Sequence, residues 1–295
     1  MPGGNRRKHS PLRATFAAWR ANLLTAFALG LSVMPTLAQD TAPHRVVSMN
    51  LCTDQLAMLI AGEGQLHSVS VLASDPRSSA MARQAEAFVI NHALAEEIFL
   101  MEPDLVLAGT FSSRATVGLL RRLGFRVEEF APATSFDDVR NHIARIGELL
   151  HRQQRAAELI AEVNAGLARL ASGPQSGQTI ALYEPNSYTA GSGTLANEIF
   201  TAAGLVNIAE RLGIAGSARL PLEQLIMAKP DLIGRSSSDY GAPALAQENL
   251  VHPAFRALAG QQVVDLPVAK MICGAPFTLD AAFMLQDAAG EQSQP

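Results

Sequence analysis

The sequence predicts an α/β protein made of two parallel-sheet lobes joined by one long α-helix, with a ligand cleft between the lobes. Short apolar strands alternate with helices over 44–130, and the same alternation restarts at 178. Between these stretches, 135–172 has apolar residues at three- and four-residue steps and contains no Pro. In addition, EEIFLMEPDLVLAG (96–109) recurs as EQLIMAKPDLIGRS (223–236). This recurrence predicts two similar halves.

The first 38 residues have the layout of a secretory signal peptide. Five basic residues precede an apolar stretch at 21–33, and the small-residue segment Thr36-Leu37-Ala38 follows it. The apolar stretch is too short to span a bilayer. Arg6-Arg7 leaves twin-arginine export open beside the general secretory route. We therefore expect an exported, soluble, periplasmic protein.

Removal of that peptide leaves 18 Lys and Arg against 27 Asp and Glu, a net charge of about −9. Neutralising nucleic-acid phosphates requires clustered Lys and Arg. The acidic balance therefore argues against nucleic acid as a partner.

The N-terminal lobe is expected over 39–134. A buried strand at 44–50 leads into a helix that Thr53 caps and that runs from Asp54 to Ala61. A strand at 66–72, a helix at 94–102 and a strand at 104–109 follow. A helix at 115–123 stops at Gly124 and precedes a strand at 125–130.

The connecting helix is expected to span 135–172, with Ser135 as its N-cap and a length of roughly 50 Å. The C-terminal lobe then covers 173–290. It comprises a strand at 178–184, a Gly-rich loop at 186–194 and a helix from 195. A helix at 222–229, a strand at 231–234, a helix near 253–259 and a strand at 262–267 complete it. The residues after Gly290 are expected to be disordered.

Two cysteines, Cys52 and Cys273, lie near opposite ends of the mature chain. In an oxidising compartment they either form a disulfide or remain two free thiols. If both face the cleft, they either contact a soft metal centre or form a cross-cleft disulfide, which would impede opening.

The order of these segments resembles the periplasmic Fe/B12-type substrate-binding proteins of ABC importers. The segments are RVVSMNLCTDQLAMLIAG, ASDPR, LAEEIFLMEPDLVLAG, the long helix, YTAGSGTLANEIFTAAG and LPLEQLIMAKPDLIG. The resemblance covers nearly all of the mature chain. It implies a protein that is not an enzyme, has no intrinsic cofactor and carries a metal–organic chelate as its transported ligand.

The resemblance also implies a partner. One Glu on each lobe of these proteins docks onto the transmembrane permease dimer, and the matching residues here are Glu96 and Glu223. The alternative is that both are solvated first-turn residues of helices, favoured by the helix dipole.

The resemblance implies that the cargo is a corrinoid such as vitamin B12, a ferric siderophore or haem. Ligands of parallel α/β sheets bind beyond the carboxyl ends of the strands. Tyr188 stands where corrinoid binders have an aromatic residue, His92 can ligate a metal, and Asp75 can accept hydrogen bonds from a chelate. The full set of ligand-binding candidates is Asn50, Cys52, Thr53, Asp75, Asn91, His92, Tyr188, Tyr240, Lys270, Met271 and Cys273.

A different class of function remains open. A chelatase-like enzyme on a related two-lobed scaffold would insert metal into a tetrapyrrole, and it needs His and carboxylate ligands. The six mature His residues are scattered along the chain, and no Ser/His/Asp or zinc-binding motif is visible. A binding protein is therefore the preferred interpretation.

Overall fold

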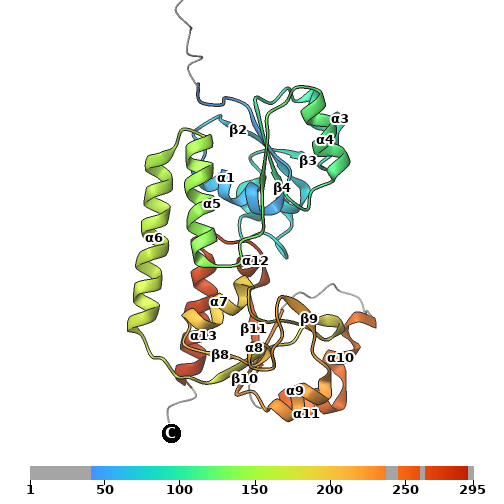
Figure 1. The fold of residues 1–295 in the computed structure, drawn as a ribbon, viewed down its shortest axis with the longest axis vertical. Coiled ribbons are helices and arrows are strands. Elements are labelled where there is room, and N and C mark those ends of the chain that lie inside the picture. Colours follow the sequence, from blue (N-terminus) through green and yellow to red (C-terminus); the bar gives the residue numbers. More distant parts are fainter. Residues whose placement is uncertain (1–40, 237–244, 260–262, 292–295) are drawn as a thin grey trace, which may run out of the picture. The chain divides into compact units, whose positions relative to one another are not determined.

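Each lobe is built on a parallel sheet, as expected (Figure 1). The computed structural model describes residues 41–236, 245–259 and 263–291, and the chain from Thr41 onward forms one unit. The predicted signal peptide and the candidate Tyr240 lie outside the described residues. No helix in the described part is long and apolar enough to cross a membrane.

The N-terminal lobe contains a five-stranded sheet in the order β3-β2-β1-β4-β5. Its strands are β1 (Val46–Ser48), β2 (Leu66–Ser70), β3 (Val89–Asn91), β4 (Leu105–Gly109) and β5 (Val127–Phe130). Its helices are α1 (Leu51–Ile60), α2 (Ala82–Ala85), α3 (Ala95–Leu100) and α4 (Arg114–Arg122).

The C-terminal lobe contains a four-stranded parallel sheet in the order β11-β10-β6-β8 and a small antiparallel pair, β7-β9. The strands are β6 (Thr179–Leu182), β7 (Tyr188–Ala190), β8 (Val206–Asn207), β9 (Ser217–Arg219), β10 (Leu232–Ser236) and β11 (Val263–Leu266). The helices are α7 (Leu195–Ala202), α8 (Ile208–Arg211), α9 (Leu222–Ala228), α10 (Glu248–Val251), α11 (Pro253–Ala259), α12 (Val268–Met271) and α13 (Thr278–Glu291). The loop predicted at 186–194 therefore contains a strand.

The central strands are buried on both faces. In β4, Leu105 and Leu107 join the larger hydrophobic core, while Val106 and Ala108 join a second core with α3 and α4 residues. Side chains of a strand alternate between the two faces of its sheet. This explains why these strands read as continuous apolar runs.

The single connecting helix predicted over 135–172 is wrong. The structure has two helices, α5 (Phe136–Leu149) and α6 (Gln153–Ser172), which lie side by side as a hairpin (Figure 1). His151 adopts a left-handed conformation with φ 54°. The amide of Arg152 then reaches back to the carbonyl of Gly147 at 2.7 Å, and that of His151 to Glu148 at 3.1 Å. This is the Schellman arrangement that ends helices.

Close packing holds the hairpin together. A Cβ on Gly147 would lie 2.4 Å from the Cβ of Ala156, so only Gly lets α5 approach α6 this closely. Further along α6, Gly166 packs against Leu279 of α13. Both lobes and both hairpin helices thereby contribute to one hydrophobic core.

The two sheets share one topology, which supports the predicted repeat. The strands β2-β1-β4-β5 correspond in order to β8-β6-β10-β11. The amide of Met49 donates to the carbonyl of Leu107 at 2.9 Å, and that of Tyr183 donates to Gly234 at 2.8 Å. Met49 and Tyr183 therefore hold equivalent places, one residue past the end of the first strand in each lobe.

Candidate functional site

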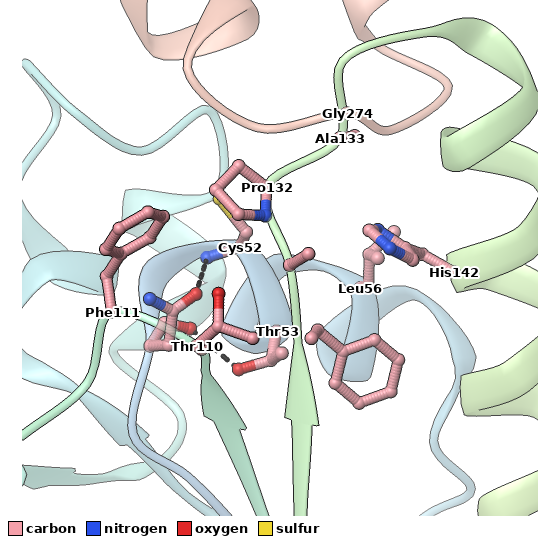
Figure 2. Close-up of a pocket in the computed structure, with 13 residues that line it drawn as sticks. Cys52, Thr53, Leu56, Thr110, Phe111, Pro132, Ala133, His142 and Gly274 are labelled. Atoms are coloured by element: carbon pink, nitrogen blue, oxygen red, sulfur yellow. Dashed lines mark hydrogen bonds between the residues drawn. The ribbon is translucent and has the colours of Figure 1, made fainter. Parts of the chain in front are cut away.

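A small cavity opens where β1, β4 and β5 end, at the edge predicted for ligand binding (Figure 2). Its volume of about 60 Å³ has room for a few water molecules. A complete macrocycle does not fit inside, so a large ligand would lie across the mouth. The lining residues are Asn50, Cys52, Thr53, Leu56, Gly109, Thr110, Phe111, Phe130, Ala131, Pro132, Ala133, His142 and Gly274.

The N-cap of α1 is Asn50 rather than the predicted Thr53. The Asn50 side-chain oxygen accepts a hydrogen bond from the amide of Cys52 at 3.0 Å. Asn caps helices well because its side chain satisfies a free first-turn amide. Thr53 is buried inside α1, where its hydroxyl donates to the carbonyl of Asn50 at 3.0 Å and lies 2.8 Å from Ser48 Oγ.

Gly109 makes room for the Asn50 amide. A Cβ on Gly109 would lie 2.7 Å from Asn50 Nδ2. No hydrogen bond from that Nδ2 to another described residue is present, so it is free to donate to a ligand. The lack of a side chain at position 109 thus lets the Asn50 amide group occupy the cavity wall as a hydrogen-bond donor.

A disulfide joins the two lobes beside the cavity. Cys52, in the first turn of α1, is bonded to Cys273, and their Cα atoms are 5.0 Å apart. This is the disulfide alternative that was expected to impede opening, and it removes both residues as thiol ligands. The adjacent Gly274 packs against Ala133 and Val139, where a Cβ would clash. The C-terminal lobe is therefore held against the segment that follows β5.

Ten of the thirteen lining residues were not among the predicted ligand residues, and Phe111 and His142 are the two with large rings at the ends of the cavity. The ring of Phe111, which follows β4, is 86 % exposed. In Figure 2, Phe111 and His142 lie on opposite sides of the segment that carries Pro132. Phe111 is detectable in principle, since it follows the strand predicted at 104–109. It provides an apolar surface at the mouth of the cavity.

His142 extends the site toward α5. Its ring contacts Phe130 edge-on, with centroids 5.6 Å apart. Burial lowers the pKa of His142, and Arg145 lowers it further, while Asp138 partly opposes this change. The imidazole is therefore neutral at neutral pH. The apolar spacing of Val139 and Ile143 places His142 on the inward face of α5.

A buried carboxyl group, Asp54, follows the lining residue Thr53 in α1. Asp54 is fully buried, and its Oδ2 accepts a hydrogen bond from Ser70 Oγ at 2.5 Å. Its Oδ1 has no hydrogen-bond partner among the described residues. Burial raises the pKa of Asp54 to about 6, against hydrogen bonds from Ser48 and Ser70 that lower it. The interior of α1 thus carries a carboxyl group that is uncharged in mild acid.

Three predicted ligand residues of the N-terminal lobe, Asp75, Asn91 and His92, lie outside this cavity. Arg77 forms hydrogen bonds with both carboxylate oxygens of Asp75 and holds its pKa below the usual range. Asn91 is fully buried and donates to Ser48 and Ser68, so the structure places it in the interior rather than at a ligand surface.

His92 is exposed and is engaged with α3. Its Nδ1 lies 2.9 Å from Glu97 Oε1, and its amide donates to Glu97 Oε2 at 2.7 Å. The structure does not bring it to the cavity.

The C-terminal candidates are also engaged elsewhere. Lys270 Nζ lies 2.6 Å from Asp280 Oδ2, and Met271 packs against the larger core. Tyr188 is half exposed in β7, with the guanidinium of Arg219 5.9 Å from its ring centroid. Of the predicted ligand residues, the structure brings Asn50, Cys52 and Thr53 to the cavity wall, with Cys273 behind them.

Glu184 is a further polar residue at a strand end, and it was not among the individual ligand candidates. It follows Tyr183, so it occupies in the C-terminal lobe the place that Asn50 occupies in the N-terminal lobe. Its Oε2 accepts a hydrogen bond from Ser236 Oγ at 2.6 Å, and burial raises its pKa. A polar group thus stands at the same sheet edge in each lobe.

Metal ligation by the protein alone has little support within the described ranges. They contain no group of three or more His, Cys, Asp or Glu side chains placed to hold a metal ion.

Two α/β lobes with a site at the strand ends and a cross-lobe contact define a two-lobed solute-binding protein. A family profile described as periplasmic binding protein matches residues 46–269. The chain belongs to this family.

Individual relatives agree with that assignment. A "Cobalamin-binding protein" of Halobacterium salinarum is 28 % identical over 199 residues, which cover 66 % of this chain. The chain matches 54 % of the length of that relative.

Solved structures share the fold at lower identity. The periplasmic heme-binding protein RhuT from Roseiflexus sp. RS-1 has a TM-score of 0.70 and 22 % identity, covering 85 % of this chain and 99 % of that one. The periplasmic vitamin B12 binding protein BtuF of Vibrio cholerae has a TM-score of 0.64 and 20 % identity, covering 86 % and 99 %. The periplasmic heme-binding protein HutB of Vibrio cholerae has a TM-score of 0.70 and 21 % identity, covering 82 % and 97 %.

Proposed function

We propose that this protein captures a metal–organic chelate in the periplasm and delivers it to an ABC permease dimer, and that a corrinoid is the first cargo to test. The observation that carries this proposal is the uncharged cavity at the ends of β1, β4 and β5, faced by the exposed ring of Phe111. The apolar ring of Phe111 at the mouth suits the face of a macrocycle. The free Asn50 amide and the Thr110 hydroxyl suit polar groups at its edge.

Among the described residues, the cavity lining contains no Lys or Arg, and this bears on which cargo fits. Haem carries two propionates and catecholate siderophores are anionic, so both are best matched by basic side chains. A corrinoid presents mainly neutral amides, which pair with amide and hydroxyl groups. The relative whose name states cobalamin binding supports the same choice.

No covalent step is needed for this role. The ligand would be retained by burial of its apolar faces and by directed hydrogen bonds. Release would require the lobes to separate. Since the disulfide holds the Cα atoms of Cys52 and Cys273 5.0 Å apart, separation would pivot about this point.

Cargo identity can be tested by mixing the purified protein with cyanocobalamin, haemin or ferric hydroxamate siderophore before gel filtration. Visible absorbance that co-migrates with the protein identifies the bound chelate, and a higher melting temperature corroborates it. We expect co-migration of cyanocobalamin and a weaker complex for Phe111→Ala. Leu100→Ala, which also alters a highly exposed apolar side chain, is the control. Haemin bound alone would contradict the corrinoid proposal.

Docking of this protein onto the permease dimer is assigned to Glu96 and Glu223. Glu96 lies in the first turn of α3 and Glu223 in the first turn of α9, and both are exposed. Neither forms an ion pair with another described residue. We expect Glu96→Ala with Glu223→Ala to abolish uptake while ligand affinity stays unchanged.

The matched control for docking is Glu86→Ala with Glu210→Ala. These residues place one exposed carboxylate on each lobe outside α3 and α9. Unchanged uptake in the Glu96/Glu223 variant, or equal losses in both variants, would refute the docking assignment.

A further inference from the structure

The two helices that carry the docking glutamates end in the same way. The residue before each Pro-Asp pair is left-handed, with φ 47° at Glu102 and 46° at Lys229. Side chains other than Gly rarely adopt this conformation. Its recurrence at equivalent positions shows that both helices leave their final turn along the same path.

Each helix end is also tied to the first strand of its own lobe. An Asp104 carboxylate oxygen accepts a hydrogen bond from the amide of Arg45 at 3.0 Å, just before β1. An Asp231 carboxylate oxygen accepts one from the amide of Thr179, the first residue of β6, at 2.7 Å. These bonds fix α3 and α9 to their sheets in equivalent positions.

An exposed apolar side chain follows each docking glutamate. Leu100 comes four residues after Glu96, and Met227 comes four residues after Glu223. Residues four apart lie on one face of a helix, one turn from each other. Leu100 and Met227 are each 79 % exposed. A single exposed apolar residue is ordinary, but equal exposure at equivalent positions of a repeat is not accounted for by packing.

We propose that Leu100 and Met227 are apolar anchors that each enter a depression in one permease subunit, beside the basic group that receives Glu96 or Glu223. The inference rests on the proposed docking function and extends it. A dimeric permease offers two equivalent sites, which match two equivalent pairs of one carboxylate and one apolar side chain. Buried apolar anchors at the centre of a contact supply much of its affinity.

Other occupants fit the charges less well. A phospholipid surface is anionic and would repel Glu96 and Glu223. A second copy of this chain would bring the same carboxylates together. A permease subunit with a basic group beside an apolar depression complements both elements.

The test measures binding of this protein to the purified ABC importer of its organism in lipid nanodiscs, without added cargo. The variant Leu100→Asn with Met227→Gln keeps approximate side-chain size and removes apolar surface. Each substitution is expected to weaken binding about tenfold. Leu245→Asn is the matched control, because Leu245 is 84 % exposed on a different segment.

Salt separates the two kinds of contact. Exposed ion pairs are screened as ionic strength rises, whereas apolar burial is not. At 0.5 M salt the Debye length is about 4 Å, so wild-type protein should retain only the part of its affinity for the importer that apolar contacts supply. The Leu100/Met227 variant should lose that remaining affinity. The Glu96/Glu223 variant should instead lose the salt-dependent part.

The outcomes distinguish the anchors from the docking function itself. If the Leu100/Met227 variant binds the importer as tightly as wild type while the Glu96/Glu223 variant binds more weakly, the two apolar side chains are not anchors. The docking role of the two glutamates then still holds. Unchanged affinity in both variants overturns docking as well. A lower melting temperature in the Asn/Gln variant calls for Leu100→Ala with Met227→Ala, which must reproduce the loss of binding.

Discussion

Burial of Asp54 predicts that removing its charge stabilises the protein above pH 6. The carboxyl group is fully buried in α1, one oxygen accepts a hydrogen bond from Ser70, and the other has no hydrogen-bond partner among the described residues. Its pKa is raised from 3.8 to about 6. The folded protein therefore binds this proton more tightly than the unfolded chain does.

The sign and size of the effect follow from linkage. The stability associated with this proton is fully present below about pH 3.8 and is lost as the pH rises through about 6. A shift of about two units corresponds to about 3 kcal/mol at neutral pH. Asp54→Asn removes the charge but adds N–H groups that need acceptors. We therefore expect a gain of about 1–3 kcal/mol at pH 7.5, or roughly 2–10 °C in Tm.

The assay is urea unfolding followed by far-UV circular dichroism at several pH values from 4.0 to 7.5, with the disulfide intact. Asp54→Asn and wild type should be similar at pH 4.0 and diverge as the pH rises. Asp287→Asn, which removes an exposed carboxylate from α13, controls for net charge. A stability difference between Asp54→Asn and wild type that is constant with pH would refute the reasoning.

Two further predictions concern the cavity wall. Replacing Cys52 and Cys273 by Ala opens a loop with a sequence separation of 221 residues; we expect the free energy of unfolding to fall by about 2–5 kcal/mol in urea titrations, and a loss below about 1 kcal/mol would contradict this. Gly109→Ala places a methyl group 2.7 Å from Asn50 Nδ2 and should cost about 1 kcal/mol through the displaced cap, with weaker chelate binding in the absorbance assay. Gly118→Ala in α4, where the nearest atom is 3.5 Å away, should instead stabilise by about 0.5–1 kcal/mol, and equal effects of the two substitutions would argue against the cap.

Much of the fold was predictable because its signals are local. The apolar runs that form β1, β4, β6 and β10 are buried on both faces, and such strands are visible as short continuous hydrophobic segments. The recurring Pro-Asp-Leu segment marks the same helix-to-strand joint twice. The two parallel sheets were predicted from this alternation and are confirmed.

The break between α5 and α6 was not predictable from the same signals. The apolar periodicity continues across the break. The left-handed position is occupied by His151 rather than by Gly, so the sequence carries no local signal for a helix end. The turn is stabilised by contacts that exist only after folding, including the approach of Gly147 to Ala156. A local pattern does not contain that information.

The candidate site likewise combines residues that the sequence predicted with residues that only tertiary packing brings together. The rule that ligands bind beyond strand ends located Asn50, Cys52 and Thr53 at the cavity. It also applies to Phe111, which the sequence analysis did not select. His142 enters from α5, whose contact with the N-terminal lobe depends on tertiary packing.

The sequence by itself determined two parallel-sheet lobes, the repeated helix-to-strand joint and the sheet edge at which a ligand would bind, because these depend on residue spacing along short segments. Only the tertiary structure decided that the connection is a helical hairpin, that Cys52 pairs with Cys273 and that Phe111 and His142 flank the cavity. Those features depend on which atoms meet when separate elements pack together, and in the disulfide the two residues are 221 positions apart in the sequence.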